Sequence, residues 1–89
     1  MRAFITVLGK DRRGIIATIS AKLYELDVNI LDINQTIMQD NFTMVMLVQL
    51  ENPDISIGML QEAMDWCAKE LSMDIRLQRE DIFSAMHRI

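Results

Sequence analysis

Cysteine, aromatic residues and long apolar runs are all scarce in this chain of 89 residues. Cys67 is the only cysteine, so no disulfide forms within the chain, and a single thiol agrees with a reducing compartment such as the cytoplasm. No uninterrupted apolar stretch approaches the roughly 20 residues that a membrane-spanning helix needs. The start of the chain, Met1 to Val7, alternates like a strand and lacks the apolar block of an export signal. The sequence therefore predicts a cytoplasmic protein that does not contact a membrane.

Basic residues are too few for a nucleic-acid-binding surface. The nine Lys and Arg residues are outnumbered by 13 Asp and Glu residues, which gives a formal net charge of -4. Binding to a phosphate backbone needs a basic face that releases counterions. RNA-binding sheets also need exposed aromatic residues on their central strands, and only Phe4 and Phe42 fall on the expected ones. We therefore expect no direct contact with nucleic acid.

Catalytic and metal-binding groupings are missing from the sequence pattern. His87 is the only histidine, and it has no second His or Cys at the spacing of metal ligands. It is distant in sequence from Ser20, Ser56 and Cys67, so no nucleophile has a base nearby along the chain. We expect no bound metal, no cofactor and no enzymatic activity.

The first third of the chain has the apolar period of a strand and then that of a helix. Residues Arg2 to Leu8 alternate between two faces, and Gly9 is expected to end this strand. From Gly14 onward, apolar residues recur in steps of three and four, which predicts one buried stripe of a helix: Ile15, Ile19, Leu23 and Leu26. Asp27 ends the helical pattern.

The middle of the chain predicts two antiparallel strands. Val28 to Gln39 is rich in β-branched residues, and Asp40-Asn41 is expected to form the tight turn that follows it. Phe42 to Leu50 is apolar on both faces, as is typical of a central strand with both sides covered. In the first of these strands the two faces are expected to carry Leu31, Ile33 and Ile37 on one side, and Asp32, Asn34 and Thr36 on the other.

The last third predicts a helix, an edge strand and a short C-terminal helix. The helical stripe consists of Ile57, Leu60, Met64, Cys67 and Leu71. Residues 73–78 alternate between apolar and polar side chains, which favours a strand at the edge of a sheet. In the tail from Glu80 to Ile89, a further stripe at helical spacing comprises Ile82, Phe83, Met86 and Ile89.

These elements predict one domain over residues 1–89, with the order strand, helix, strand, strand, helix, strand. This α+β arrangement is the ferredoxin-like split βαβ sandwich, in which two helices cover one face of a four-stranded antiparallel sheet. With right-handed crossovers, the first and third strands lie centrally and pair with the fourth and second strands at the edges. The other sheet face stays bare in a monomer, so we expect that this face or an edge strand meets a second subunit in a homodimer with two-fold symmetry.

The segment from Gly9 to Ile15 joins the first expected strand to the first helix and concentrates positive charge, with Lys10, Arg12 and Arg13. A helix start leaves backbone N–H groups without partners and carries partial positive charge, and Gly14 would let an anion approach the backbone. Asp11 would cap the helix or accept a ligand ammonium group. In the alternative without a ligand, Asp11 only caps the helix and Gly14 only allows tight packing. The three basic side chains then lie in a solvated loop.

Residues Gly9 to Ile15, together with Val28-Asn29-Ile30, resemble the ligand-site signature of ACT domains. That family carries Asp-x-x-Gly-Ile after its first strand, and an Asn that often precedes Ile at the start of its second. The resemblance covers the whole chain and is greatest to stand-alone single ACT domains and to those of glycine-cleavage regulators. Many ACT domains have proline where this chain has Arg13.

The resemblance implies a pocket at an interface between two domains. The backbone from Asp11 to Ile15 would line one side of it, and Asn29 with Ile30 would line the other. The Asn29 amide offers both donors and an acceptor, which suits the charged groups of an amino acid. In its alternative role, Asn29 simply favours the turn before a strand. Gln35 and Thr36 are weaker candidates for the site, and the hairpin surface is the first expectation for both.

The resemblance therefore implies a regulatory module that binds a small molecule, in the first instance an amino acid, as a homodimer. Its output would pass to another protein, which the sequence does not identify. One alternative is a structural or adaptor dimer whose loop binds nothing. Another is an acylphosphatase-like hydrolase that holds phosphate with Arg12 or Arg13, although the chain lacks the longer glycine-rich loop of that family.

Overall fold

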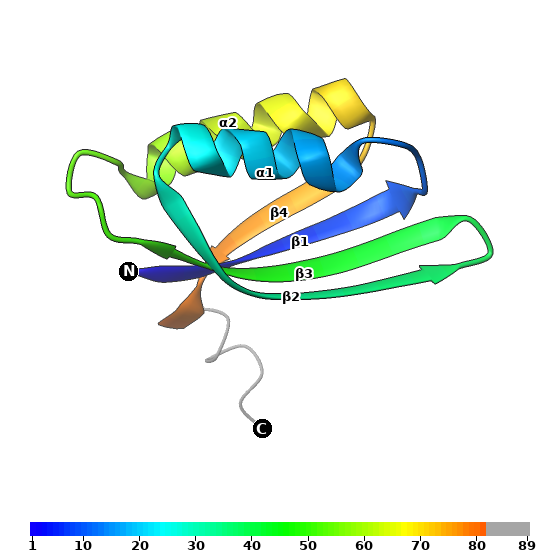
Figure 1. Ribbon diagram of the computed structural model, residues 1–89, viewed down its shortest axis with the longest axis horizontal. Coiled ribbons are helices and arrows are strands. Elements are labelled where there is room, and N and C mark those ends of the chain that lie inside the picture. The colour runs from blue at the N-terminus through cyan, green and yellow to red at the C-terminus, as the bar shows by residue number, and fades with distance from the viewer. Residues whose placement is uncertain (82–89) are drawn as a thin grey trace.

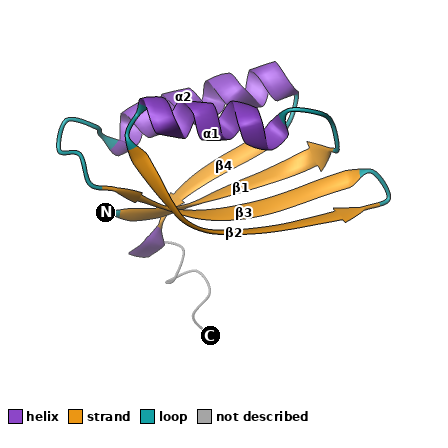
Figure 2. Ribbon diagram, viewed as in Figure 1, coloured by secondary structure: helices purple, strands orange, loops and turns teal. Residues whose placement is uncertain are grey.

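The computed structural model describes residues 1–81 of the chain. The elements are β1 (Arg2–Lys10), α1 (Ile15–Glu25), β2 (Val28–Met38), β3 (Asn41–Leu50), α2 (Ile57–Leu71) and β4 (Asp74–Arg79). The strands form one antiparallel sheet in the order β2-β3-β1-β4, and both helices lie on the same face of it (Figure 1, Figure 2). The predicted ferredoxin-like fold is therefore confirmed. The predicted C-terminal helix falls mainly on residues 82–89, which lie outside the described residues.

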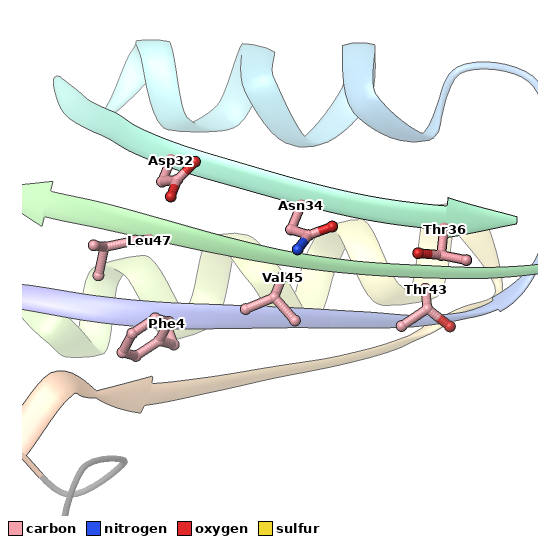
Figure 3. Close-up of a pocket in the computed structure, with 7 residues that line it drawn as sticks. All are labelled: Phe4, Asp32, Asn34, Thr36, Thr43, Val45 and Leu47. Atoms are coloured by element: carbon pink, nitrogen blue, oxygen red, sulfur yellow. The ribbon is translucent and has the colours of Figure 1, made fainter.

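The sheet face opposite the helices, here called the open face, holds a wide pocket. This pocket has a volume of about 610 Å³ and contains none of the site residues that the sequence predicts. It has an apolar part formed by Phe4, Val45 and Leu47 (Figure 3). The polar side chains that line it are those of Asp32, Asn34, Thr36 and Thr43.

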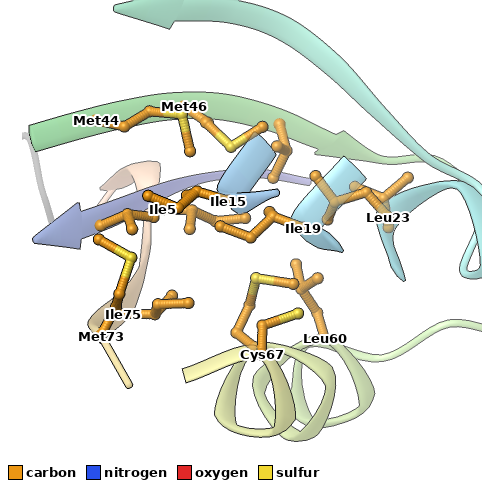
Figure 4. Packing of buried hydrophobic residues seen from close by; sticks show 14 of the residues in the cluster. Ile5, Ile15, Ile19, Leu23, Met44, Met46, Leu60, Cys67, Met73 and Ile75 are labelled. Atoms are coloured by element: carbon orange, nitrogen blue, oxygen red, sulfur yellow. The ribbon is translucent and has the colours of Figure 1, made fainter. Parts of the chain in front are cut away.

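The core fills the space between the sheet and the two helices. Alternation in β1 directs Ala3, Ile5 and Val7 toward the helices, and all three are fully buried. The two helices contribute apolar stripes that meet these strand residues (Figure 4). The stripes consist of Ile15, Ile19 and Leu23 in α1, and of Leu60, Met64, Cys67 and Leu71 in α2.

Strand β1 continues past Gly9, where the sequence had predicted its end. Gly9 and Lys10 pair with Phe42 and Asn41 of β3. The glycine is needed for close approach, because a Cβ atom at this position would lie 3.0 Å from the Cε atom of Met73. Gly9 therefore marks a packing contact inside the strand and not a break in it.

The β2–β3 turn lies one residue earlier than the predicted Asp40-Asn41. Its two central residues are Gln39 and Asp40, with φ angles of 48° and 71°, and β3 already begins at Asn41. Positive φ at both positions is characteristic of the type I′ turn that joins antiparallel strands through two residues. The pairing of Ile37 with Phe42 fixes this register, so Gln39 adopts a conformation that its residue type does not favour.

Strand β2 contains a β-bulge at Leu31. Ile30 pairs with the buried Val48, whereas Asp32 pairs with Leu47, so Leu31 is an additional residue in the strand. Strict alternation would put Ile30 and Asp32 on the same face. Because of the bulge, Ile30 faces the helices and Asp32 faces the open side.

Candidate functional site

Helix α1 begins without a side-chain cap. Gly14 occupies the N-cap position in the left-handed conformation, with φ 87° and ψ 7°, and no side chain accepts a hydrogen bond from the first turn. Helix α2 differs, because the hydroxyl group of Ser56 accepts a hydrogen bond from the Met59 amide at 3.1 Å. No acidic residue lies in the first turn of α1. This helix start therefore presents amides and partial positive charge to an external anion.

Two of the predicted site residues hold the loop before α1 in place. The backbone N–H of Asp11 donates to the carbonyl oxygen of Asp40 at 2.7 Å, which ties the loop to the β2–β3 turn. The guanidinium group of Arg12 donates to the carbonyl oxygen of Leu71, where a cation is favourable beside a helix C-terminus. Asp11 is therefore not the cap of α1, which corrects that interpretation, and Arg12 is engaged by the fold.

Lys10 and Arg13 supply the other positive charges of the loop. Both residues are exposed, and neither side chain makes a hydrogen bond or an ion pair with another residue in the part of the chain that the structure describes. The same holds for the carboxylate of Asp11. The loop thus offers two cations and one anion that folding leaves available for a ligand.

A pocket of about 280 Å³ lies against this loop. It is near the lower end of the roughly 300–1,000 Å³ that ligand pockets commonly span, so it suits a molecule of amino-acid size. Ile16 and Ile37 form exposed apolar walls, with 38% and 52% of their surface accessible. The full lining comprises Asp11, Arg12, Gly14, Ile15, Ile16, Ala17, Gln35, Ile37 and Phe42.

The sequence interpretation missed the contribution of the β2–β3 hairpin to this pocket. Gln35 had been only a weaker candidate for the site, and Ile37 and Phe42 had not been considered for it. These residues reach the pocket because Asp11 is bonded to Asp40 at the hairpin turn. No local sequence signal reports that contact. Thr36, by contrast, lines the open-face pocket.

Asn29 lies at the other end of α1 from Gly14. It is exposed at the start of β2 and lines a separate pocket of about 350 Å³, together with Tyr24, Asp27 and Gln49 among others. The 11 residues of α1 span about 16 Å, which is too far for one small molecule to contact both ends. Within one chain, the two halves of the predicted site are therefore not brought together.

Ile30 follows Asn29 but belongs to the interior. Its side chain is half-buried and packs against the hydrophobic core beside Val48. Ile30 therefore helps to position the start of β2 against the core.

Two further observations limit the chemistry of residues 1–81. No three His, Cys, Asp or Glu side chains of this region gather where they could hold a metal ion. Burial raises the pKa of the Cys67 thiol, and the nearby positive charge of Lys22 opposes that shift. Neutral and enclosed, this thiol is a core residue rather than a nucleophile.

Among residues 1–81, no helix has the length and apolar character to cross a membrane.

Comparison with known proteins gives consistent matches over the length of the chain. The sequence profile of the ACT domain matches residues 2–78. A UPF0237 protein of Methanopyrus kandleri is 49% identical over 88 residues, which cover 99% of this chain and 98% of that protein. An ACT domain protein from Streptococcus pneumoniae superposes with a TM-score of 0.80 and 37% identity over 93% of both chains. A putative glycine cleavage system transcriptional repressor shares the fold, with a TM-score of 0.77 and 22% identity over 88% of this chain and 44% of that one.

Proposed function

Because the chain belongs to the ACT domain family, we propose that it binds an amino acid between two subunits of a homodimer. The ACT domain is a regulatory module that often binds amino acids. The proposal adds the position of the site, the oligomeric state and the chemistry of the ligand. It needs no catalytic group, and its output is a change in the stability of one dimer arrangement.

The proposal rests on the distance between Asn29 and the pocket beside Gly14, which one small molecule cannot bridge within a single chain. Both regions border β2, which is an edge strand whose outer side is unpaired among the described residues. In a two-fold antiparallel pairing of two β2 edges, the start of one strand lies opposite the end of the other. Gln35 and Ile37 belong to the end of β2, so this pairing brings Asn29 of the partner subunit toward the pocket.

The groups around the pocket match the parts of an amino acid. The uncapped amides of α1 attract the carboxylate. Arg13 is not among the lining residues, but it stands in the chain between the lining residues Arg12 and Gly14, and its charge adds to this attraction. The carboxylate of Asp11 and the amide oxygen of Asn29 from the partner subunit accept hydrogen bonds from the ammonium group. Ile16 and Ile37 offer apolar surface to the ligand side chain. We therefore expect preference for an amino acid with a small or medium-sized apolar side chain.

Thermal unfolding of the protein with each of the twenty amino acids tests this function. A ligand present at 100 times its dissociation constant stabilises the folded state by about 2.7 kcal/mol, which gives a clear rise in melting temperature. We expect a rise with one or a few apolar amino acids, and its loss in Arg13→Ala and in Asn29→Ala. Lys69→Ala is the matched control, because it removes an exposed cation on α2, away from the pocket.

The same experiment separates the proposal from the adaptor alternative. If no amino acid changes the melting temperature of a protein that is dimeric by light scattering, the chain is a dimerisation module without a ligand. If the rise survives in both site variants, the ligand binds elsewhere and the assigned pocket is wrong.

A further inference from the structure

Tyr24 is the most exposed of the large hydrophobic residues that the structure describes, with 86% of its surface accessible. An aromatic ring in water gives up the stabilisation that burial of its apolar surface would bring. Tyr24 stands near the end of α1 and lines the same pocket as Asn29. Asn29 is the residue that the proposed dimer carries to the ligand site of the other subunit. Tyr24 therefore accompanies it to that site.

Three residues of α1, among them Tyr24, form a stripe on the side of the helix that borders β2. Ile16, Ser20 and Tyr24 follow one another at intervals of four, which places them along one side of the helix. Ile16 identifies this side, because it lines a pocket together with residues of β2. Helix α2 lies away from this edge, since α1 contacts β2 whereas α2 contacts β4 (Figure 1). The stripe therefore faces the edge that pairs in the proposed dimer.

One two-fold axis satisfies both the pairing of the strands and this stripe. In β2, the axis passes midway between Asn29 and Gln35, and in α1 it passes at Ser20, midway between Ile16 and Tyr24. Ile16 and Gln35 share one pocket. Tyr24 and Asn29 share another, so the two midpoints lie at the same level along the sheet edge. The two antiparallel α1 helices then place each Tyr24 opposite Ile16 of the partner subunit.

We propose that Tyr24 of the partner subunit closes the ligand pocket beside Gly14. This inference rests on the proposed function and adds an aromatic wall to its site. Within one chain the pocket is open, because Ile16 and Ile37 leave 38% and 52% of their surface accessible. Pockets for small molecules commonly enclose about 70–90% of the ligand surface. The ring of the partner's Tyr24 supplies the apolar cover that one chain lacks.

The ring also limits the size of the ligand. It faces the apolar walls of the pocket, so the side chain of a bound amino acid lies between Ile37 and the partner's Tyr24. Removal of the ring leaves space that a longer apolar side chain fills. Tyr24 therefore contributes to affinity and to selection by size.

Nuclear Overhauser contacts between labelled and unlabelled chains test the position of Tyr24. It is the only tyrosine of the chain, so its ring signals are assigned without ambiguity. We expect contacts from this ring to the methyl groups of Ile16 that isotope filtering assigns to different molecules. Absence of these contacts in a protein that is dimeric by light scattering would overturn the inference.

Two variants of Tyr24 test its role in binding. Calorimetric titration uses the amino acid that stabilises the wild type, and light scattering verifies that each variant is dimeric. We expect Tyr24→Ala to bind about fivefold to tenfold more weakly, whereas Tyr24→Phe keeps the ring and should bind within about twofold of the wild type. Unchanged affinity in Tyr24→Ala would contradict an aromatic wall, and so would an equal loss in both variants.

Mixed dimers show to which pocket the ring belongs. An Asn29→Ala chain and an Arg13→Glu chain form a heterodimer with one intact site, made from the loop of the first chain and the amide of the second. Tyr24→Ala added to the Asn29→Ala chain should leave this site at wild-type affinity. The same change added to the Arg13→Glu chain should weaken it. The reverse pattern would place Tyr24 over the pocket of its own chain and overturn the inference.

The same titrations distinguish failure of this inference from failure of the proposed function. If the wild type binds an amino acid and only Arg13→Ala and Asn29→Ala lose it, the two-subunit site stands and the role of Tyr24 is wrong. If the wild type binds no amino acid, the proposed function fails, and the inference that rests on it fails as well.

Discussion

The guanidinium group of Arg12 donates a hydrogen bond to the carbonyl oxygen of Leu71 at 3.2 Å, and so joins the loop before α1 to the last turn of α2. The contact fixes the loop that carries Gly14. Arg13, the next residue, has a side chain without hydrogen bonds or ion pairs to the described residues. Two adjacent arginines of the candidate site therefore differ in role, one holding the loop and the other available to a ligand.

Arg12→Ala is expected to lower the free energy of unfolding by about 1 kcal/mol, because the Leu71 carbonyl loses a charged donor. Arg13→Ala should change it by less than about 0.5 kcal/mol, as is usual for an exposed side chain. Urea denaturation of both variants measures the difference. Equal destabilisation by the two substitutions would show that the Arg12 contact does not hold the loop.

Gly14→Ala is expected to destabilise the protein by about 1–2 kcal/mol through backbone strain, since φ is 87° at this position. Steric overlap is not the reason, because an added Cβ would meet only the Thr18 hydroxyl at 3.9 Å. Gly14→Asn should cost less, because asparagine tolerates the left-handed region. Thermal unfolding compares the two, and an equal or greater loss for asparagine would contradict this explanation.

Gly9→Ala is expected to cost about 1–3 kcal/mol for a different reason, the overpacking of Met73. The added Cβ would lie 3.0 Å from Cε and 3.1 Å from Cγ of that side chain. Gly58→Ala serves as the control, because its nearest contact is the Ser56 hydroxyl at 3.7 Å, and a gain of about 0.5 kcal/mol is expected in a helix. A loss at Gly58 similar to that at Gly9 would indicate that packing against Met73 is not the cause.

Stability should fall at alkaline pH through Cys67. Burial raises the pKa of its thiol in the folded state, so the folded protein keeps this proton to higher pH than the unfolded chain. The contribution is complete below the unfolded pKa of about 8.5 and is lost as pH rises through the folded-state pKa. Denaturation curves between about pH 7 and pH 10 should show a smaller decline for Cys67→Ala than for the wild type. Identical slopes would mean that the thiol is not the responsible group.

Apolar periodicity was sufficient to predict the fold, and the relationship to ACT domains was predicted from the resemblance of Gly9 to Ile15 and Val28-Asn29-Ile30 to the signature of that family. Both predictions are confirmed. Buried stripes such as Ile15, Ile19 and Leu23 repeat at a spacing that only a helix satisfies. Details set by contacts between elements were not predictable. Gly9 continues β1 because Met73 packs on it, and Leu31 is an extra residue in β2 because of the pairing with β3.

The residues of the candidate site also fall into two groups, those that the sequence pattern predicts and those that only contacts between elements bring to the site. The loop from Lys10 to Ile15 was predictable, because glycine and charge gather there within a few residues. Ile37 and Phe42 were not, because the bond between Asp11 and Asp40 brings the distant hairpin beside the loop. Asn29 lies one helix length away from this loop within the described chain, and the two-subunit site that the resemblance implies for it stays a prediction.

Mixing two inactive variants tests most directly whether two subunits share one ligand site. Arg13→Glu repels the ligand carboxylate on the loop side, and Asn29→Ala removes the amide on the other side. Each homodimer should bind none of the amino acid that stabilises the wild type. After subunit exchange in an equal mixture, a two-fold dimer with two such sites restores about a quarter of them, because one site of each heterodimer is intact. Calorimetric titration that recovers this fraction at wild-type affinity is the predicted result. No recovery in a mixture shown to contain heterodimers would contradict a site built from two subunits.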